Sequence, residues 1–129
     1  MNDLSCMVTA PLLSIVDDDE SVREALPDLL REFGFAVEAF SSAEEFLASD
    51  AGSRTRCLVL DIRMPGMSGL ELQRELVHRR QAIPIVFITA DRDETLHPRL
   101  IAEGAVGCLL KPFSETALLD AINAALRCG

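Results

Sequence analysis

The sequence has few basic residues and no local clusters of cysteine. Of its 129 residues, 12 are Lys or Arg and 21 are Asp or Glu, so the formal net charge is −9. Because contacts to phosphate backbones require clustered Lys and Arg, this shortage argues against direct binding of DNA or RNA. Hydrophobic residues make up 49% of the chain and charged residues 26%. That balance is typical of one globular domain rather than of a disordered chain.

Features of secreted and membrane proteins are also lacking. The four cysteines show no CxxC or Cys/His pairing, and they are Cys6, Cys57, Cys108 and Cys128. Cys57 and Cys108 lie in apolar runs, where a free thiol behaves as a small hydrophobic group. No basic residue precedes Arg23, and residues 4–16 contain a proline, so we expect neither a signal peptide nor a membrane span. We therefore expect a cytoplasmic protein.

Short apolar runs alternate with amphipathic stretches along the whole chain. The runs predict five strands, at residues 12–16, 35–39, 57–60, 84–88 and 107–110. Each is followed by apolar residues at three- and four-residue spacing, which is typical of one face of a helix. Runs that are apolar on both faces indicate a parallel sheet covered by helices on each side. We therefore predict a doubly wound α/β fold of the flavodoxin-like (βα)5 type, with strand order 2-1-3-4-5.

Residues that begin or end helices support these boundaries. Ser42 and Glu45 have the spacing of a capping box, and Ser114 is a candidate cap for the last helix. Gly34 has the position of a residue that ends the first helix. Asp19 and its neighbours have the composition of a helix N-cap, so a purely structural role stays open for this group. We interpret the two histidines, His78 and His97, as surface residues.

Polar and charged residues follow the strands at their carboxyl ends. Asp17 and Asp18 follow the first predicted strand, and Asp61 follows the third. Thr89 follows the fourth strand and Lys111 the fifth. In an open parallel sheet these ends share one edge, and ligands bind where the strand order reverses, here between the first and third strands. We therefore predict that all five residues line one pocket.

The residue types in this predicted pocket favour phosphoryl chemistry. Three neighbouring carboxylates repel one another unless a cation joins them. Oxygen ligands of this kind suit Mg²⁺, which completes its shell with water and phosphate. Lys111 is the single lysine of the chain and would contact a phosphoryl oxygen, while Thr89 would supply a hydroxyl donor. The set predicts a phosphoryl-transfer site with one Mg²⁺.

Four segments around these residues resemble the receiver domain of bacterial two-component response regulators, the CheY-like family. They are IVDDD at residues 15–19, LDIRMPGMSG at 60–69, ITA at 88–90 and LKPF at 110–113. The resemblance covers residues 12–127, and it leaves residues 1–11 as an N-terminal tail and residues 128–129 as a C-terminal tail. Four motifs in this order and at these spacings are a specific signal.

The resemblance implies a role for each residue of the pocket. Asp61 would be the phosphoacceptor, which attacks the phosphorus of a phosphohistidine on a sensor histidine kinase. Asp17, Asp18, Asp61 and the backbone carbonyl of Arg63 would hold the Mg²⁺. The phosphoryl group would be contacted by Lys111, by Thr89 and by the backbone of Ala90. Pro65, Gly66, Gly69 and Pro112 would shape the loops, and the Lys111–Pro112 bond resembles a cis peptide of the family.

One position departs from the family pattern. Thr89 and residue 108 would form the switch, and the family usually carries Tyr or Phe where this chain has Cys108. A cysteine cannot reproduce the inward rotation of an aromatic ring. Cys108 therefore keeps open a second interpretation, a pseudo-receiver that acts only as a protein-interaction module. A third, a Mg²⁺-dependent phosphohydrolase, usually requires a second acid just after the nucleophile, where this chain has Ile62 and Arg63.

The resemblance also implies partners. Besides the sensor kinase, it implies a downstream output protein or a C-terminal effector domain outside these 129 residues. It implies a homodimer formed on phosphorylation and slow autodephosphorylation, so the chain would not be a classical enzyme. No direct nucleic-acid or membrane partner is expected.

Overall fold

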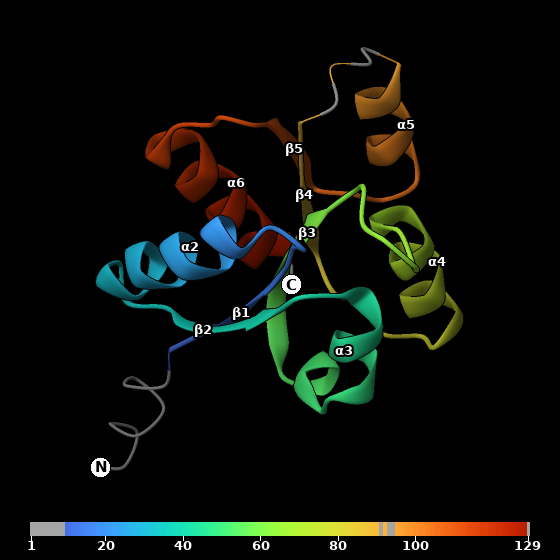
Figure 1. Cartoon of the computed structure of the whole chain (residues 1–129), viewed down its shortest axis with the longest axis horizontal. Coiled ribbons are helices and arrows are strands. Elements are labelled where there is room, and N and C mark those ends of the chain that lie inside the picture. Colours follow the sequence, from blue (N-terminus) through green and yellow to red (C-terminus); the bar gives the residue numbers. More distant parts are fainter. Residues whose placement is uncertain (1–9, 91, 93–94, 129) are drawn as a thin grey trace.

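The computed structural model describes residues 10–90, 92 and 95–128. A five-stranded sheet lies at the centre in the order β2-β1-β3-β4-β5 (Figure 1). All neighbouring strands pair in parallel. The strands are β1 (Leu12–Val16), β2 (Ala36–Phe40), β3 (Thr55–Asp61), β4 (Ile85–Thr89) and β5 (Gly107–Leu110). The predicted doubly wound fold and its strand order are confirmed. Most of the predicted tail at residues 1–11, with Cys6, lies outside the described residues.

Helices cover both faces of the sheet. They are α2 (Glu20–Glu32), α3 (Ala43–Ala48), α4 (Gly69–His78), α5 (Leu96–Ala102) and α6 (Glu115–Cys128), with a short 3-10 helix at Ala51–Ser53. Helices α2 and α6 pack on one face, and α3, α4 and α5 on the other (Figure 1). Neighbouring residues of β3 alternate between the two cores, with Leu58 on the α3, α4 and α5 side and Val59 on the α2 and α6 side.

Two strands are shifted by one residue from the prediction, and β3 is longer than predicted. We predicted 35–39 and 84–88, and the strands are Ala36–Phe40 and Ile85–Thr89. The Phe35 N–H donates to the carbonyl of Leu30 (3.3 Å) at the end of α2, so sheet pairing starts only at Ala36. Pro84 has no N–H to donate, although its carbonyl still accepts from Leu58 (2.9 Å).

The predicted helix caps are present, with one difference. The Ser42 side chain accepts a hydrogen bond from the Glu45 N–H, but the Glu45 side chain accepts from the Ser41 N–H instead of closing the box on Ser42. The complete capping box joins Ser68 and Glu71 at the start of α4. The Ala117 N–H donates to Ser114 at the start of α6 (3.0 Å). Within the described ranges, no helix combines the length and apolar character needed to cross a membrane.

The end of α4 carries a backbone strain that a glycine would relieve. Among the described residues, Arg80 is the non-glycine residue with a positive φ, 58°. We expect Arg80→Gly to raise the free energy of unfolding by about 0.5 kcal/mol, because glycine adopts this conformation without a steric cost. Urea unfolding followed by circular dichroism would measure the change. Arg80→Ala, which removes the same side chain but keeps the Cβ, should give no gain, and equal effects of both variants would contradict the explanation.

Candidate functional site

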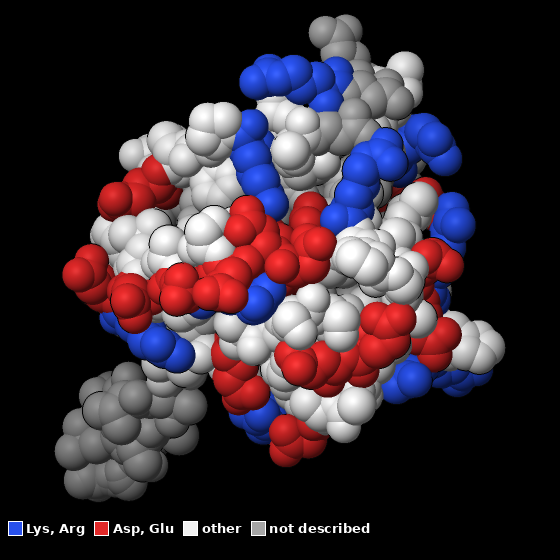
Figure 2. Space-filling model, viewed as in Figure 1, with Lys and Arg blue, Asp and Glu red and all other residues white. Residues whose placement is uncertain are grey.

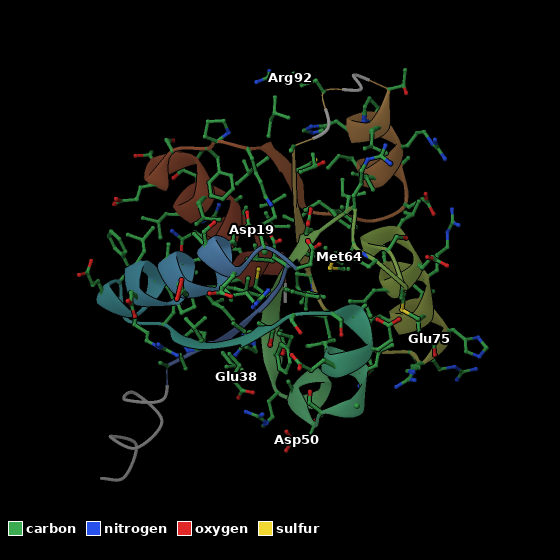
Figure 3. All side chains as sticks on the ribbon, in the orientation of Figure 1. Asp19, Glu38, Asp50, Met64, Glu75 and Arg92 are labelled. Carbon is green, nitrogen blue, oxygen red and sulfur yellow. The ribbon has the colours of Figure 1, made fainter. Side chains whose placement is uncertain are left out.

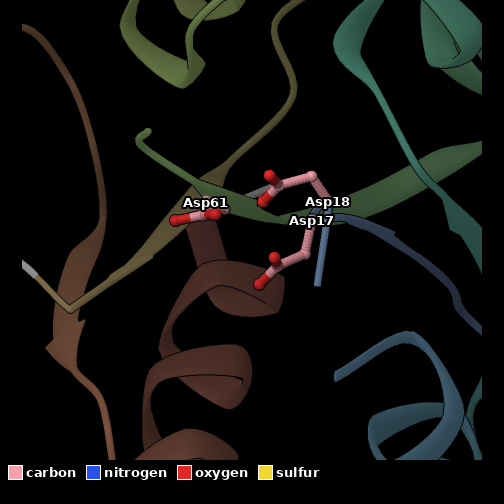
Figure 4. A group of neighbouring side chains, drawn as sticks. All are labelled: Asp17, Asp18 and Asp61. Carbon is pink, nitrogen blue, oxygen red and sulfur yellow. The ribbon is translucent and has the colours of Figure 1, made fainter. Parts of the chain in front are cut away.

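Three carboxylates meet at the carboxyl ends of β1 and β3, as the sequence predicts. Asp17, Asp18 and Asp61 each offer an oxygen atom, and these atoms lie within 4.8 Å of one another (Figure 4). The two strands are neighbours, with Val16 paired to Leu60, so Asp17, which follows β1, lies level with Asp61, the last residue of β3. Asp17 is fully buried and Asp61 is 6% exposed, whereas Asp18 is exposed.

Asp17 is held from several directions. Its two carboxylate oxygens accept separate hydrogen bonds, one from the Asp19 N–H (2.9 Å) and one from Lys111 Nζ (2.9 Å). Its backbone carbonyl accepts from the Arg23 guanidinium (3.0 Å), and its own N–H donates to the carbonyl of Phe40 (3.2 Å). The buried carboxylate is therefore fixed in place and paired with a cation, as buried charges require.

Asp19 does not join the three carboxylates but caps α2. One of its oxygens accepts from both the backbone N–H and the hydroxyl of Ser21, at 3.0 and 2.7 Å. These hydrogen bonds lower the pKa of Asp19 below its ordinary value. The structural role left open for this run thus applies to Asp19, while Asp17 and Asp18 belong to the carboxylate cluster.

The electrostatics of the site are unusual at Asp61 and Lys111. Burial, followed by the charge of Asp17, raises the pKa of Asp61 from 3.8 to about 7. Burial opposes the charge on Lys111, but its hydrogen bond to Asp17 and the charge of Asp61 outweigh that effect and raise its pKa. Without a bound cation, ionisation of all three carboxylates is therefore unfavourable, because folding brings like charges close together in a partly desolvated site.

The other predicted site residues line an open cleft beside this cluster. A cavity of about 430 Å³ is lined by Asp61, Arg63, Thr89, Ala90 and Lys111. Thr89 is 4% exposed, and its carbonyl accepts a hydrogen bond from the Lys111 N–H (2.7 Å), which joins the ends of β4 and β5. On this face, acidic side chains gather along α2 and toward the centre, and basic side chains lie above them (Figure 2). Thr89 and Lys111 thus line the same cleft as Asp61.

The loop after β3 is closed directly beside Asp61. The Gly69 N–H donates to the carbonyl of Ile62 (2.8 Å), and a Cβ at Gly69 would overlap the backbone carbonyl oxygen of Asp61. Met64, labelled in Figure 3, is 9% exposed and packs into the core on the side of α4. Gly66 has a positive φ of 74° at the tip. The Lys111–Pro112 peptide bond is cis.

The position after Asp61 holds buried Ile62, and the next holds exposed Arg63. The second acid required by a phosphohydrolase is therefore missing from both positions. Cys108 lies on β5 opposite Phe87, and its half-buried position raises the pKa of its thiol. Cys57 is fully buried, and its pKa is raised to about 12. His78 and His97 are exposed, as predicted.

Two residues that contact the site were missed by sequence reasoning. Arg23 donates to the carbonyl of Asp17, and Glu44 accepts from the backbone of Met67 in the loop after β3 (3.0 Å). Neither lies in one of the four family-like segments or at a strand end. Their contacts depend on how α2 and α3 pack beside the sheet edge, which hydrophobic periodicity does not specify.

Comparison with known proteins gives a consistent result. The sequence model for the response regulator receiver domain matches residues 13–123. The chain is 48% identical over 118 residues to the response regulator protein TodT of Pseudomonas putida, covering 92% of this chain and 52% of TodT. It thus spans about half the length of the curated relatives it matches.

Solved structures agree with this match. The structure of the response regulator StyR is 51% identical with a TM-score of 0.86, and the match covers 93% of this chain and 61% of that one. The chemotaxis protein CheY4 of Vibrio cholerae is 28% identical with a TM-score of 0.82, covering 92% of this chain and 100% of that one. With its motifs at one sheet edge and a family match over most of its length, this chain belongs to the response regulator receiver domain family.

Proposed function

We propose that this chain is the phosphoacceptor switch of a two-component system and that Asp61 takes a phosphoryl group from a phosphohistidine on a sensor histidine kinase. The observation that carries the proposal is the cluster of Asp17, Asp18 and Asp61. Lys111 joins it through its hydrogen bond to Asp17, and Lys111 and Asp61 both line the open cleft. The same proposal places the chain in the cytoplasm.

The chain's own residues support each part of the transfer. A carboxylate oxygen of Asp61 attacks phosphorus while the bond from phosphorus to the histidine nitrogen breaks, and the leaving imidazole takes a proton. Asp61 must be ionised to attack, and the positive charge of Lys111 lowers its pKa against the effects of burial and Asp17. Lys111, the Thr89 hydroxyl and the Ala90 backbone then contact the phosphoryl oxygens in the cleft. Positioning and charge neutralisation provide most of the catalysis in such a reaction.

The acidic cluster fits a Mg²⁺ ion. Three carboxylates with oxygens inside 4.8 Å form the hard oxygen donor set that this ion prefers. Asp17, Asp18, Asp61 and the backbone carbonyl of Arg63 would hold one ion. When bound, it would offset the repulsion among the acids and withdraw charge from the phosphoryl oxygens.

The proposed output runs through Thr89 and the face formed by α5, β5 and α6. Thr89 lies at the end of β4, next to β5, where Cys108 replaces the expected aromatic ring. The proposed partners are the sensor kinase and an output protein or effector domain, and phosphorylation is proposed to favour a homodimer. A role for the effector domain is supported by the length of the relatives, of which this chain covers about half.

Intact-mass spectrometry after incubation with acetyl phosphate tests the phosphoacceptor role. We expect a single added phosphoryl group that requires Mg²⁺ and is absent in Asp61→Asn, because the amide is not a nucleophile. Asp50→Asn, at an exposed carboxylate paired with Arg54, is the matched control and should be phosphorylated as the wild type is. If the wild type gains no adduct and binds no Mg²⁺, the proposal fails and the interaction-module interpretation is favoured.

A further inference from the structure

Glu44 connects helix α3 to the loop that follows the proposed phosphoacceptor. It lies in the first turn of α3, and its Oε2 accepts a hydrogen bond from the Met67 N–H at 3.0 Å, across 23 positions of sequence. The carboxylate lies directly against the loop tip, since a Cβ built on Gly66 would come within 2.7 Å of the same oxygen. The positive φ at position 66 favours glycine, and the missing Cβ leaves room for the Glu44 carboxylate in this position.

The helix that carries Glu44 is firmly anchored. Ser42 caps α3 by accepting from the Glu45 N–H at 3.0 Å. Ala43 and Phe46 are buried, at 0% and 1% exposure, and the Phe46 ring packs edge-on against Phe40 of β2. Glu44 thus extends from a fixed base toward the loop.

The loop between β3 and α4 is closed at its base and is held near its tip by Glu44. The base is closed by the hydrogen bond from the Gly69 N–H to the carbonyl of Ile62, and Met64 is buried. Arg63, whose carbonyl is a proposed Mg²⁺ ligand, lies between this base and the tip held by Glu44. With Ile62 held at one end and Met67 at the other, only four residues span the distance between them, and each has at most two free dihedrals, so the bond to Met67 limits the orientations open to the Arg63 carbonyl.

We propose that Glu44 is a positioning residue, which orients the backbone carbonyl of Arg63 for the metal through its hydrogen bond to Met67. This inference rests on the proposed function, since it concerns the same Mg²⁺ site. The effect depends on the hydrogen bond rather than on the charge. A neutral side chain of the same shape that accepts the hydrogen bond from Met67 should therefore orient the loop equally well.

Calorimetric titration of the whole chain with Mg²⁺ tests this role, since the chain has no Trp or Tyr to report binding by fluorescence. We expect Glu44→Ala to weaken Mg²⁺ binding about 5- to 10-fold, which is near the lower end of the effects of indirect metal-site contacts. Glu44→Gln retains an acceptor oxygen and should bind within about twofold of the wild type, as expected for a hydrogen bond that does not need the charge.

Glu45→Ala is the matched control. Glu45 is the next residue of the same helical turn, but its carboxylate accepts from the Ser41 N–H and does not reach the loop. This variant should lose helix stability yet bind Mg²⁺ as the wild type does. If Glu44→Ala and the wild type bind Mg²⁺ with equal affinity, the positioning role of Glu44 is wrong, while the proposed metal site stands. A wild-type chain that binds no Mg²⁺ would overturn the proposed metal site as well.

Discussion

Asp61→Asn will raise the free energy of unfolding at pH 7 in metal-free buffer, by between about 2 and 4 kcal/mol. Burial and the neighbouring charge of Asp17 raise the pKa of Asp61 from 3.8 to about 7 in the folded chain. The folded state therefore binds this proton more tightly than the unfolded state does. The resulting stability is fully present below about pH 4 and is lost as the pH rises toward 7. Asparagine, which resembles the protonated acid, keeps that stability at every pH.

Thermal and urea unfolding in EDTA between pH 4 and pH 8 would measure this effect. The wild type and Asp61→Asn should have similar stability near pH 4 and should differ increasingly up to pH 7. Asp50→Asn provides the control, because Asp50 is exposed and its variant should follow the wild type across the range. A difference between Asp61→Asn and the wild type that stays constant with pH would mean that the cause is packing rather than ionisation.

The fold was predictable from the sequence because its strands are buried on both sides. Continuous apolar runs such as residues 12–16 distinguish such strands from amphipathic helices and indicate a sheet covered by two layers. The small errors arose where backbone hydrogen bonds decide the boundary. The Phe35 N–H bonds to Leu30 at the end of α2, and a hydrophobicity pattern contains no information on that bond.

The sequence was sufficient to predict the site residues that lie at the ends of strands. Parallel strands bring their carboxyl ends to one edge, so Asp17, Asp61 and Lys111 could be assigned to one pocket before any distance was known. The ion pair between Lys111 and Asp17 required the structure, because it depends on the reach of a side chain across β3 and β4. The contacts of Arg23 and Glu44 also required the structure. Both residues belong to helices, and their contacts depend on how those helices pack beside the sheet.

Gly69 was predicted to shape the loop after β3, and the structure places it as the first residue of α4. Glycine next to a turn is usually explained by backbone freedom, but Gly69 does not have a positive φ. The structure gives a steric reason instead. The Asp61 carbonyl oxygen, the Asp61 carbonyl carbon and Ile62 Cα are the three atoms nearest to the place that a Cβ would occupy. All three are backbone atoms, which cannot rotate away as a side chain can.

Gly69→Ala will consequently destabilise the fold by about 2–4 kcal/mol, even though alanine is intrinsically the better helix former. The overlap must be relieved by moving α4 away from the end of β3 or by moving the backbone of Asp61. A shift of the Asp61 backbone displaces the proposed nucleophile from Lys111 and Asp17, and a shift of α4 pulls on the loop that joins α4 to Asp61. The rate of phosphorylation by acetyl phosphate should therefore fall on the order of a hundredfold, as expected for a displacement of about 1 Å at a reacting group.

Gly107→Ala is the matched control for this prediction. The same substitution in β5 would place a Cβ 3.8 Å from Ala121 Cβ, which is an ordinary contact. It should change the free energy of unfolding by less than about 0.5 kcal/mol and leave the rate of phosphorylation unchanged. Urea unfolding and the time course of the intact mass measure both properties for each variant. If Gly69→Ala matches Gly107→Ala in both, the close approach of α4 to the Asp61 carbonyl does not constrain the site.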